Sequence, residues 1–175
     1  KPMSRRLLFW LLFALMAAVY LTMLLWSLPH LRALSGGQAP FDLRPGGYTL
    51  AEAQALLAAM GEGGRAYYLG VQQSLDSAYP ALFGVVMVLA FRALAPGGLG
   101  LGLGVLALLG AGFDYVENLR VAVLLRADPE AVTAAMVSAA SLATVLKSLA
   151  VTLALLALLA LLGMRRWRRW RRRFT

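Results

Sequence analysis

Five polar residues lie inside long hydrophobic stretches of the chain and form its densest group of side chains capable of chemistry. A charged side chain at the centre of a membrane helix costs about 2.5 to 3.5 kcal/mol on insertion scales, so each needs a partner or a purpose. We call these residues the polar layer: Asp76, Asp114, Glu117, Asn118 and Lys147. Such a group either clamps helices together or forms a pocket for a lipid headgroup, a small ligand or an ion.

The charges of the polar layer do not balance. Asp76, Asp114 and Glu117 supply three negative charges, and Lys147 and Arg120 supply two positive charges. One carboxylate is therefore left without a counter-ion. Either it is protonated because it is desolvated, or a bound cation or basic ligand group balances it.

Spacing along the chain adds neighbours to the polar layer. Asp114, Glu117 and Asn118 follow an i, i+3, i+4 pattern, which places them on one face of a helix. Tyr79 lies within one helical turn of Asp76, so we include it among the candidate ligand-binding residues. The other polar residues within one turn of Asp76 or Lys147 are Gln72, Gln73, Thr144 and Ser148.

The composition requires a membrane protein. Of the 175 residues, 61% are hydrophobic and 14% are charged, whereas a soluble domain has roughly half apolar and a quarter charged residues. Cysteine is absent and His30 is the single histidine, so disulfides, thiol chemistry, bis-histidine haem and ordinary zinc sites lack their ligands. We expect a single all-α domain with no cofactor and no metal.

Four hydrophobic segments are long enough to cross a bilayer, which requires about 20 residues. The predicted spans are residues 7–28, 76–94, 99–125 and 131–164. They predict a polytopic bundle of four transmembrane helices. We expect the first span to be a permanent anchor, because it is longer than the hydrophobic part of a signal peptide.

Basic residues predict the orientation of the spans. Eleven lie in the N-terminus, the short turn near Arg92 and the C-terminal tail (residues 165–175), and four lie in the other connections. This bias places both termini in the cytoplasm. In the tail, the residues expected to contact anionic lipid headgroups, rather than nucleic acid, are Arg165, Arg166, Trp167, Arg168, Arg169 and Trp170.

The depth of the polar layer follows from the same orientation. Counted at about 1.5 Å per residue from the cytoplasmic end of each span, its ionisable residues lie at about 24 to 30 Å. They therefore share one depth near the outer boundary of a hydrocarbon core about 30 Å thick. The connection of residues 29–73 emerges on that side, and we expect it to form a small extracytoplasmic helical cap over the polar layer.

The cap contains recognisable helix signals. Thr49 followed by Glu52 is a capping box that opens a helix through about Met60, and Gly61 closes it. A second helix from about residue 64 is expected to run into the second span and to bend near Pro80.

Glycine alternates with leucine at residues 98–104, which superficially resembles a phosphate-binding loop. No strand precedes it, and all the intervening residues are leucine. Close helix packing through small residues is therefore the better interpretation.

Short motifs surround the polar layer. They are Gly47-Tyr48-Thr49 with Glu52, Gly61 and Gly64-Arg65 with Tyr68, Asp76-x-x-Tyr79-Pro80, Asp114-x-x-Glu117-Asn118, and Lys147. This pattern, over residues 45–150, resembles a group of small four-helix bacterial membrane proteins of uncharacterised function. The resemblance implies the same fold, a location in the cytoplasmic membrane of a bacterium, and no particular activity.

Three functions are compatible with these residues. The first is binding of a lipid headgroup, small ligand or ion in the polar layer, with the cap as a lid. The second is an accessory subunit of a larger membrane complex or a homo-oligomer. The third is an intramembrane hydrolase or transferase that uses Asp76 and Asp114 as an acid/base pair. Lipoprotein signal peptidases are similar in placing two aspartates in a four-helix bundle, but Lys147 would tend to neutralise such a pair.

Overall fold

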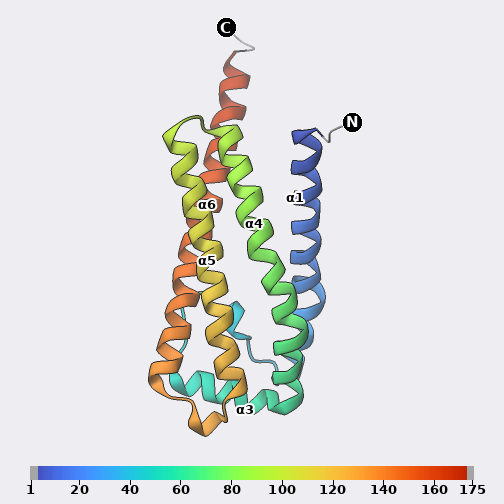
Figure 1. Cartoon of the computed structure of the whole chain (residues 1–175), viewed down its shortest axis with the longest axis vertical. Helices are drawn as coiled ribbons and strands as arrows, with labels where there is room; N and C mark the ends of the chain where they lie inside the picture. The colour runs from blue at the N-terminus through green and yellow to red at the C-terminus, as the bar shows by residue number, and fades with distance from the viewer. Residues whose placement is uncertain (1–3, 173–175) are drawn as a thin grey trace.

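The structure is a computed structural model that describes residues 4–172, so Lys1 and residues 173–175 of the basic tail lie outside it. Four helical stretches are long and apolar enough to cross a membrane: Arg5–Leu34, Leu50–Leu94, Gly98–Arg126 and Ala134–Arg171. The described residues contain no strand. Both ends of the chain lie at the same end of the bundle (Figure 1). The prediction of an all-α, multi-pass helical bundle is confirmed.

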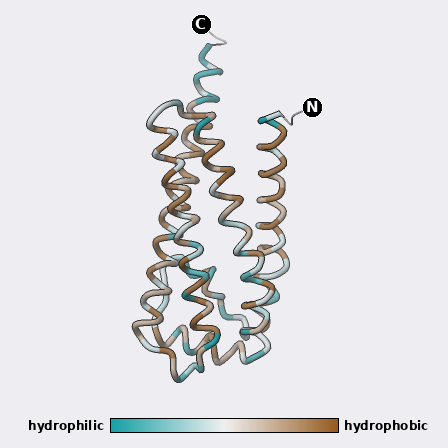
Figure 2. The backbone as a smooth tube through the Cα atoms, in the orientation of Figure 1, coloured by the Kyte–Doolittle hydropathy of each residue, from teal (hydrophilic) through white to brown (hydrophobic). Residues whose placement is uncertain are grey.

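Hydropathy follows this architecture. Figure 2 shows hydrophobic residues along the long helices and a hydrophilic C-terminal end of α6. Such a distribution is that of helices whose sides face lipid and whose ends face water.

The first span is longer than predicted. It comprises α1 (Arg5–Thr22), a π-helical turn at Met23–Ser27 and α2 (Leu28–Leu34). Helix thus continues through Pro29, where we expected the cap to begin. In the π-helical turn the N–H of Leu28 donates to the carbonyl oxygen of Met23, five residues back. This wider turn shifts the hydrogen-bond pattern just before the proline, which itself has no N–H to donate.

Helix α3 (Leu50–Tyr67) lies across the end of the bundle opposite the termini (Figure 1). The predicted capping box is present. Thr49 Oγ1 accepts from the N–H of Glu52 at 3.3 Å, and Glu52 Oε2 accepts from the N–H of Thr49 at 2.7 Å. Gly61 interrupts the helix with a φ of 58°, a conformation that glycine adopts without steric cost. The predicted break at Gly61 is therefore confirmed.

The cap leads directly into the second span. A π-helical turn at Tyr68–Gln72 joins α3 to α4 (Gln73–Leu94). The helix continues through Pro80. The irregular turn lies about two helical turns before the proline near which we expected a bend.

The third and fourth spans form a hairpin of long helices, α5 (Gly98–Arg126) and α6 (Ala134–Arg171), joined through a 3-10 turn at Pro129–Ala131. The fourth helix begins three residues later than predicted, because Thr133 caps it by accepting from the N–H of Met136 at 3.3 Å. It continues beyond the apolar residues into the basic tail and ends at Arg171.

The glycines of α5 pack against α4. A Cβ atom on Gly100 would collide with the carbonyl oxygen of Ala95, and one on Gly104 would lie 3.4 Å from Val88. Gly102, on another face, meets nothing within 4 Å. Close packing through small residues is therefore confirmed for part of the glycine run.

Two apolar clusters lie on either side of the polar layer. One joins the cap to the ends of α5 and α6 and includes Leu56, Leu57, Val121, Leu124 and Val137. The other holds the opposite half of the bundle together and includes Phe83, Met87, Phe91, Ala107 and Ala154. On α5 and α6, the polar layer therefore interrupts the apolar packing at one level.

Candidate functional site

Lys147 of α6 is the centre of the polar layer. Its Nζ lies 3.0 Å from Asp114 Oδ1 and also forms an ion pair with Glu117, both from α5. Thr144, one turn before Lys147, donates its hydroxyl to Glu117 Oε1 at 2.5 Å. Glu117 and Thr144 are fully buried, and the Lys147 side chain is 13% exposed. The prediction that these residues meet is borne out by their contacts.

Arg120 does not belong to this cluster, contrary to our charge balance. It is exposed, and both ion pairs found among residues 4–172 are made by Lys147. At about 100° per residue, the face that carries Asp114, Glu117 and Asn118 continues to Val121, which is buried, rather than to Arg120. One lysine thus faces three buried carboxyl groups.

Amide side chains join α4 to α5 beside the lysine. Asn118 Nδ2 donates to the carbonyl oxygen of Asp76 at 3.3 Å, and Gln73 Nε2 donates to the carbonyl oxygen of Asn118 at 2.8 Å. Tyr115 donates its hydroxyl to the carbonyl oxygen of Ser77 at 2.8 Å. The bonds that hold Asp76 in place therefore use its backbone and leave its carboxyl group unused.

The carboxyl group of Asp76 is buried without a hydrogen-bond donor. The residue is 6% exposed, and its Oδ2 makes no hydrogen bond with any part of the chain that the structure describes. The same holds for Oε1 of Gln72, which is 1% exposed and lies one turn earlier, at the end of the π-helical turn that leads into α4. Buried acceptors without a donor cost about 1 to 3 kcal/mol each. Two of them on one helix face mark a place where a donor is missing.

Tyr79 contacts aromatic rings of both the first and the second span. Its ring centroid lies 5.6 Å from that of Tyr20 on α1 and 5.9 Å from that of Phe83 on α4. Tyr79 therefore packs in the contact between the first two spans.

The cap supplies residues to the site that the predicted set lacked. Tyr48 is buried, its N–H donates to Ser141 Oγ at 2.9 Å, and its hydroxyl lies beside Thr144. Burial raises the pKa of Tyr48 well above its usual value, and the nearby Glu117 carboxylate adds to the increase. Tyr48 lies in one of the motifs quoted above. Its contact with α6 could not be predicted from the sequence, because Tyr48 and Ser141 are 93 residues apart in the chain.

One further contact lies within the cap, and another joins the cap to the bundle. Tyr68 donates its hydroxyl to Asp42 Oδ2 at 2.6 Å. Gly47 has a φ of 85°, and a Cβ atom there would lie 2.5 Å from Ser141 Oγ. Close approach of the backbone to α6 therefore requires glycine at this position.

The contacts of the polar layer can be compared with two kinds of chemistry, a metal site and an acid/base pair. Among residues 4–172 no group of three or more His, Cys, Asp or Glu side chains is placed to hold a metal ion. Asp114 forms an ion pair with Lys147, so it does not face Asp76 as a free partner. Asp76 Oδ2 and Gln72 Oε1 remain as buried acceptors without a donor.

The predicted headgroup contacts lie at the far end of the bundle. Trp167 and Trp170 are 53% and 58% exposed, and the Arg171 guanidinium lies 4.3 Å from the centroid of the Trp167 ring. This end is separated from the polar layer by the apolar half of the bundle that contains Ala154.

Comparisons with protein families, with curated proteins and with solved structures found no match to this chain.

Proposed function

We propose that this protein is a membrane-embedded binding protein that holds the ammonium group of a lipid headgroup or small ligand at Asp76 and Gln72. The observation that supports this function is the pair of buried acceptors, Asp76 Oδ2 and Gln72 Oε1, that lack donors. A primary ammonium group carries three N–H donors and one positive charge. It would satisfy both oxygens and balance the carboxylate.

The charge of the surrounding site supports a cationic ligand. Lys147 is shared between Asp114 and Glu117, which leaves Asp76 as the excess carboxyl group. Asp42, Asp114 and Glu117 lie within electrostatic range of Asp76, and so does one cation, Lys147, which leaves the surroundings net negative. Their combined field attracts positive charge and repels anions.

The cap would act as the cover of this site. Tyr48 ties it to α6, and the hydrogen bond from Tyr68 to Asp42 holds it together internally. The chain bends at Gly61, and π-helical turns join the cap region to the first and second spans. Such turns are frequent at functional sites and permit local rearrangement. We place this cover outside the cell and the polar layer in the outer leaflet of a bacterial cytoplasmic membrane.

The substitution Asp76→Asn is expected to affect ligand binding and protein stability in opposite directions. Without ligand, the variant is expected to be more stable than the wild type by about 1 to 3 kcal/mol, because an unpaired buried carboxyl group is replaced by a neutral amide. Phosphatidylethanolamine is expected to raise the thermal midpoint of the wild type but not that of the variant. Phosphatidylcholine, whose ammonium carries no N–H, should raise neither. The measurement is thermal unfolding of the full chain in detergent with each lipid, and with free ethanolamine as a soluble probe.

Asp128→Asn is the matched control, because Asp128 is an exposed acid in the connection between α5 and α6. It should leave both stability and the lipid response unchanged. A loss of stability in ligand-free Asp76→Asn would contradict the proposal, since it would mean that the carboxyl group already has a partner in the chain. Infrared spectroscopy can show whether the Asp76 carboxyl group is protonated. If it is, and if added amine does not deprotonate it, a purely structural role for the polar layer would be favoured.

The orientation can be tested with single cysteines, because the chain contains none. Glu130→Cys, in the exposed connection between α5 and α6, is expected to react with a membrane-impermeant thiol reagent in intact cells. Gly98→Cys, between α4 and α5, should react only after the cells are opened. A Cβ at Gly98 meets nothing within 4 Å, so this change does not disturb packing. The reverse labelling pattern would place the cap in the cytoplasm.

A second candidate function is an accessory subunit, which the exposure of α1 favours. None of the residues Arg5–Thr22 is buried, and Trp10 and Leu11 are 54% and 51% exposed. An apolar helix with so few covered residues offers a face to a neighbouring membrane helix or to a second copy. The mass of the purified chain in mild detergent, alone or with co-isolated subunits, tests this alternative.

A further inference from the structure

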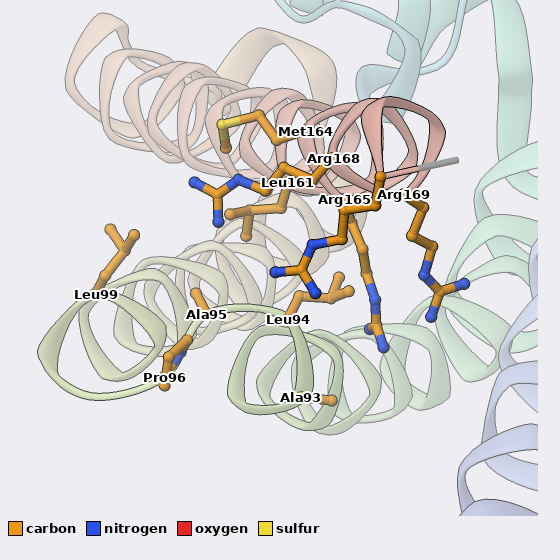
Figure 3. Close-up of a pocket in the computed structure, with 11 residues that line it drawn as sticks. Ala93, Leu94, Ala95, Pro96, Leu99, Leu161, Met164, Arg165, Arg168 and Arg169 are labelled. Carbon is orange, nitrogen blue, oxygen red and sulfur yellow. The ribbon is translucent and has the colours of Figure 1, made fainter. Parts of the chain in front are cut away.

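A groove of about 360 Å³ lies between α6 and the turn that joins α4 to α5 (Figure 3). It is at the end of the bundle opposite the cap, and it is therefore distinct from the proposed ammonium site. Its lining is apolar on the side of the turn, where Leu94, Pro96 and Leu99 contribute, and basic on the side of α6.

The basic side is a single helix face. The four arginines that line the groove are Arg165, Arg168, Arg169 and Arg172. Their spacing of i, i+3, i+4 and i+7 places them on one stripe of α6, and Leu161 extends that stripe by one turn toward the apolar part of the helix. Figure 3 shows the labelled arginines extending from α6 around the space that faces the turn.

The arginines of the groove lack acidic partners. Within residues 4–172 the ion pairs are those of Lys147, and the groove lining contains no Asp or Glu. Trp167 and Trp170 lie on the opposite face of the helix. The two faces of the tail thus differ: one presents uncompensated positive charge beside an apolar floor, and the other presents aromatic rings.

We propose that this groove is a stoichiometric binding site for one anionic phospholipid. The guanidinium groups bind the phosphate, for which their planar pairs of N–H donors are suited. An acyl chain lies along Leu99 and Leu161. From Leu161 to Arg172 the groove extends about 16 Å along the helix, enough to bridge the boundary between acyl chains and headgroups. Basic pockets between membrane helices on the cytoplasmic side bind anionic headgroups in this way.

The two kinds of lining explain why a lipid is a better occupant than a free anion. Inorganic phosphate would use the arginines and leave the apolar floor in contact with water. An uncharged lipid would cover Leu99 and Leu161 and leave the positive charge unbalanced. An anionic phospholipid satisfies both parts of the groove at once.

The test is native mass spectrometry of the full chain in detergent with added phosphatidylglycerol. One tightly retained lipid per chain is expected. Arg168→Gln should weaken its retention about fivefold, the effect of one arginine near a lipid phosphate. Ala93→Trp should weaken it as well, because Ala93 is exposed and lines the groove, so an indole ring fills the space without changing the charge.

Arg166→Gln is the matched control. It removes the same charge from the same tail, but Arg166 does not line the groove, so retention should change less than twofold. Equal losses in Arg166→Gln and Arg168→Gln would overturn the proposal in favour of diffuse surface attraction. Displacement of the lipid by glycerol phosphate, or equal retention of phosphatidylcholine, would also overturn it. Unchanged thermal unfolding of the variants establishes that each has folded.

Discussion

Lys147→Met is expected to destabilise the protein by about 3 to 5 kcal/mol, the usual cost of removing one partner from a buried ion pair. The substitution keeps an unbranched side chain of similar length and removes the single cation that contacts Asp114 and Glu117. Glu117 is fully buried, so its charge would be left in a dehydrated layer with Thr144 as its remaining donor. Chemical or thermal unfolding in detergent measures the loss.

Second substitutions test whether the loss is electrostatic. Neutralising an acid together with the lysine should recover stability, and Glu117→Gln should recover more than Asp114→Asn, because Glu117 is the more deeply buried. Arg120→Met is the matched control. Arg120 is an exposed cation at the same end of the bundle, and its loss should cost less than about 0.5 kcal/mol. If the single and double variants unfolded alike, the ion-pair account of the polar layer would be wrong.

The second large effect is expected at Gly100. Gly100→Ala should destabilise the protein by about 1 to 3 kcal/mol, as overpacking does in a close-packed interior. Its Cβ would collide with the carbonyl oxygen of Ala95 and would lie 3.0 Å from that of Phe91. Both are backbone atoms, so the contact cannot be relieved by a change of rotamer, and α4 and α5 would have to separate.

The same glycine run contains its own control at Gly102. Because a Cβ there meets nothing within 4 Å, Gly102→Ala should leave stability unchanged or raise it by up to about 1 kcal/mol through better helix propensity. Opposite signs for two identical substitutions two residues apart would identify helix contact as the cause. A loss of the same size in both would point instead to a requirement for flexibility in the run.

The predicted effects at Asp76 and Lys147 differ in sign, which connects stability with function. Lys147 forms ion pairs with its partners, so its removal leaves their charges unbalanced and lowers the stability of the protein. Asp76 has no donor for Oδ2, so replacing its carboxyl group removes a buried unpaired acceptor and raises the stability of the protein. A residue whose replacement stabilises the protein while removing ligand response is the expected behaviour of a binding site that is retained for function.

Features set by neighbouring residues could be predicted from the sequence alone. The four spans depend on hydropathy summed over about 20 residues, and the capping box at Thr49 depends on atoms three residues apart. The break at Gly61 depends on the conformational freedom of one residue. The shared depth of Asp114, Glu117 and Lys147 also followed, because helical rise is uniform and the spans are anchored at their ends.

Contacts between distant segments were decided only by the tertiary structure. The π-helical turn that carries the first span through Pro29 has no local sequence rule, and the exposure of Arg120 depended on which face of α5 met α6. Whether the oxygens of Asp76 and Gln72 find donors depends on every side chain around them. The groove exists because α6 passes the turn between α4 and α5. Sequence determines local backbone and burial, since these depend on short-range interactions, whereas the pairing of buried polar groups depends on how whole helices are rotated against one another.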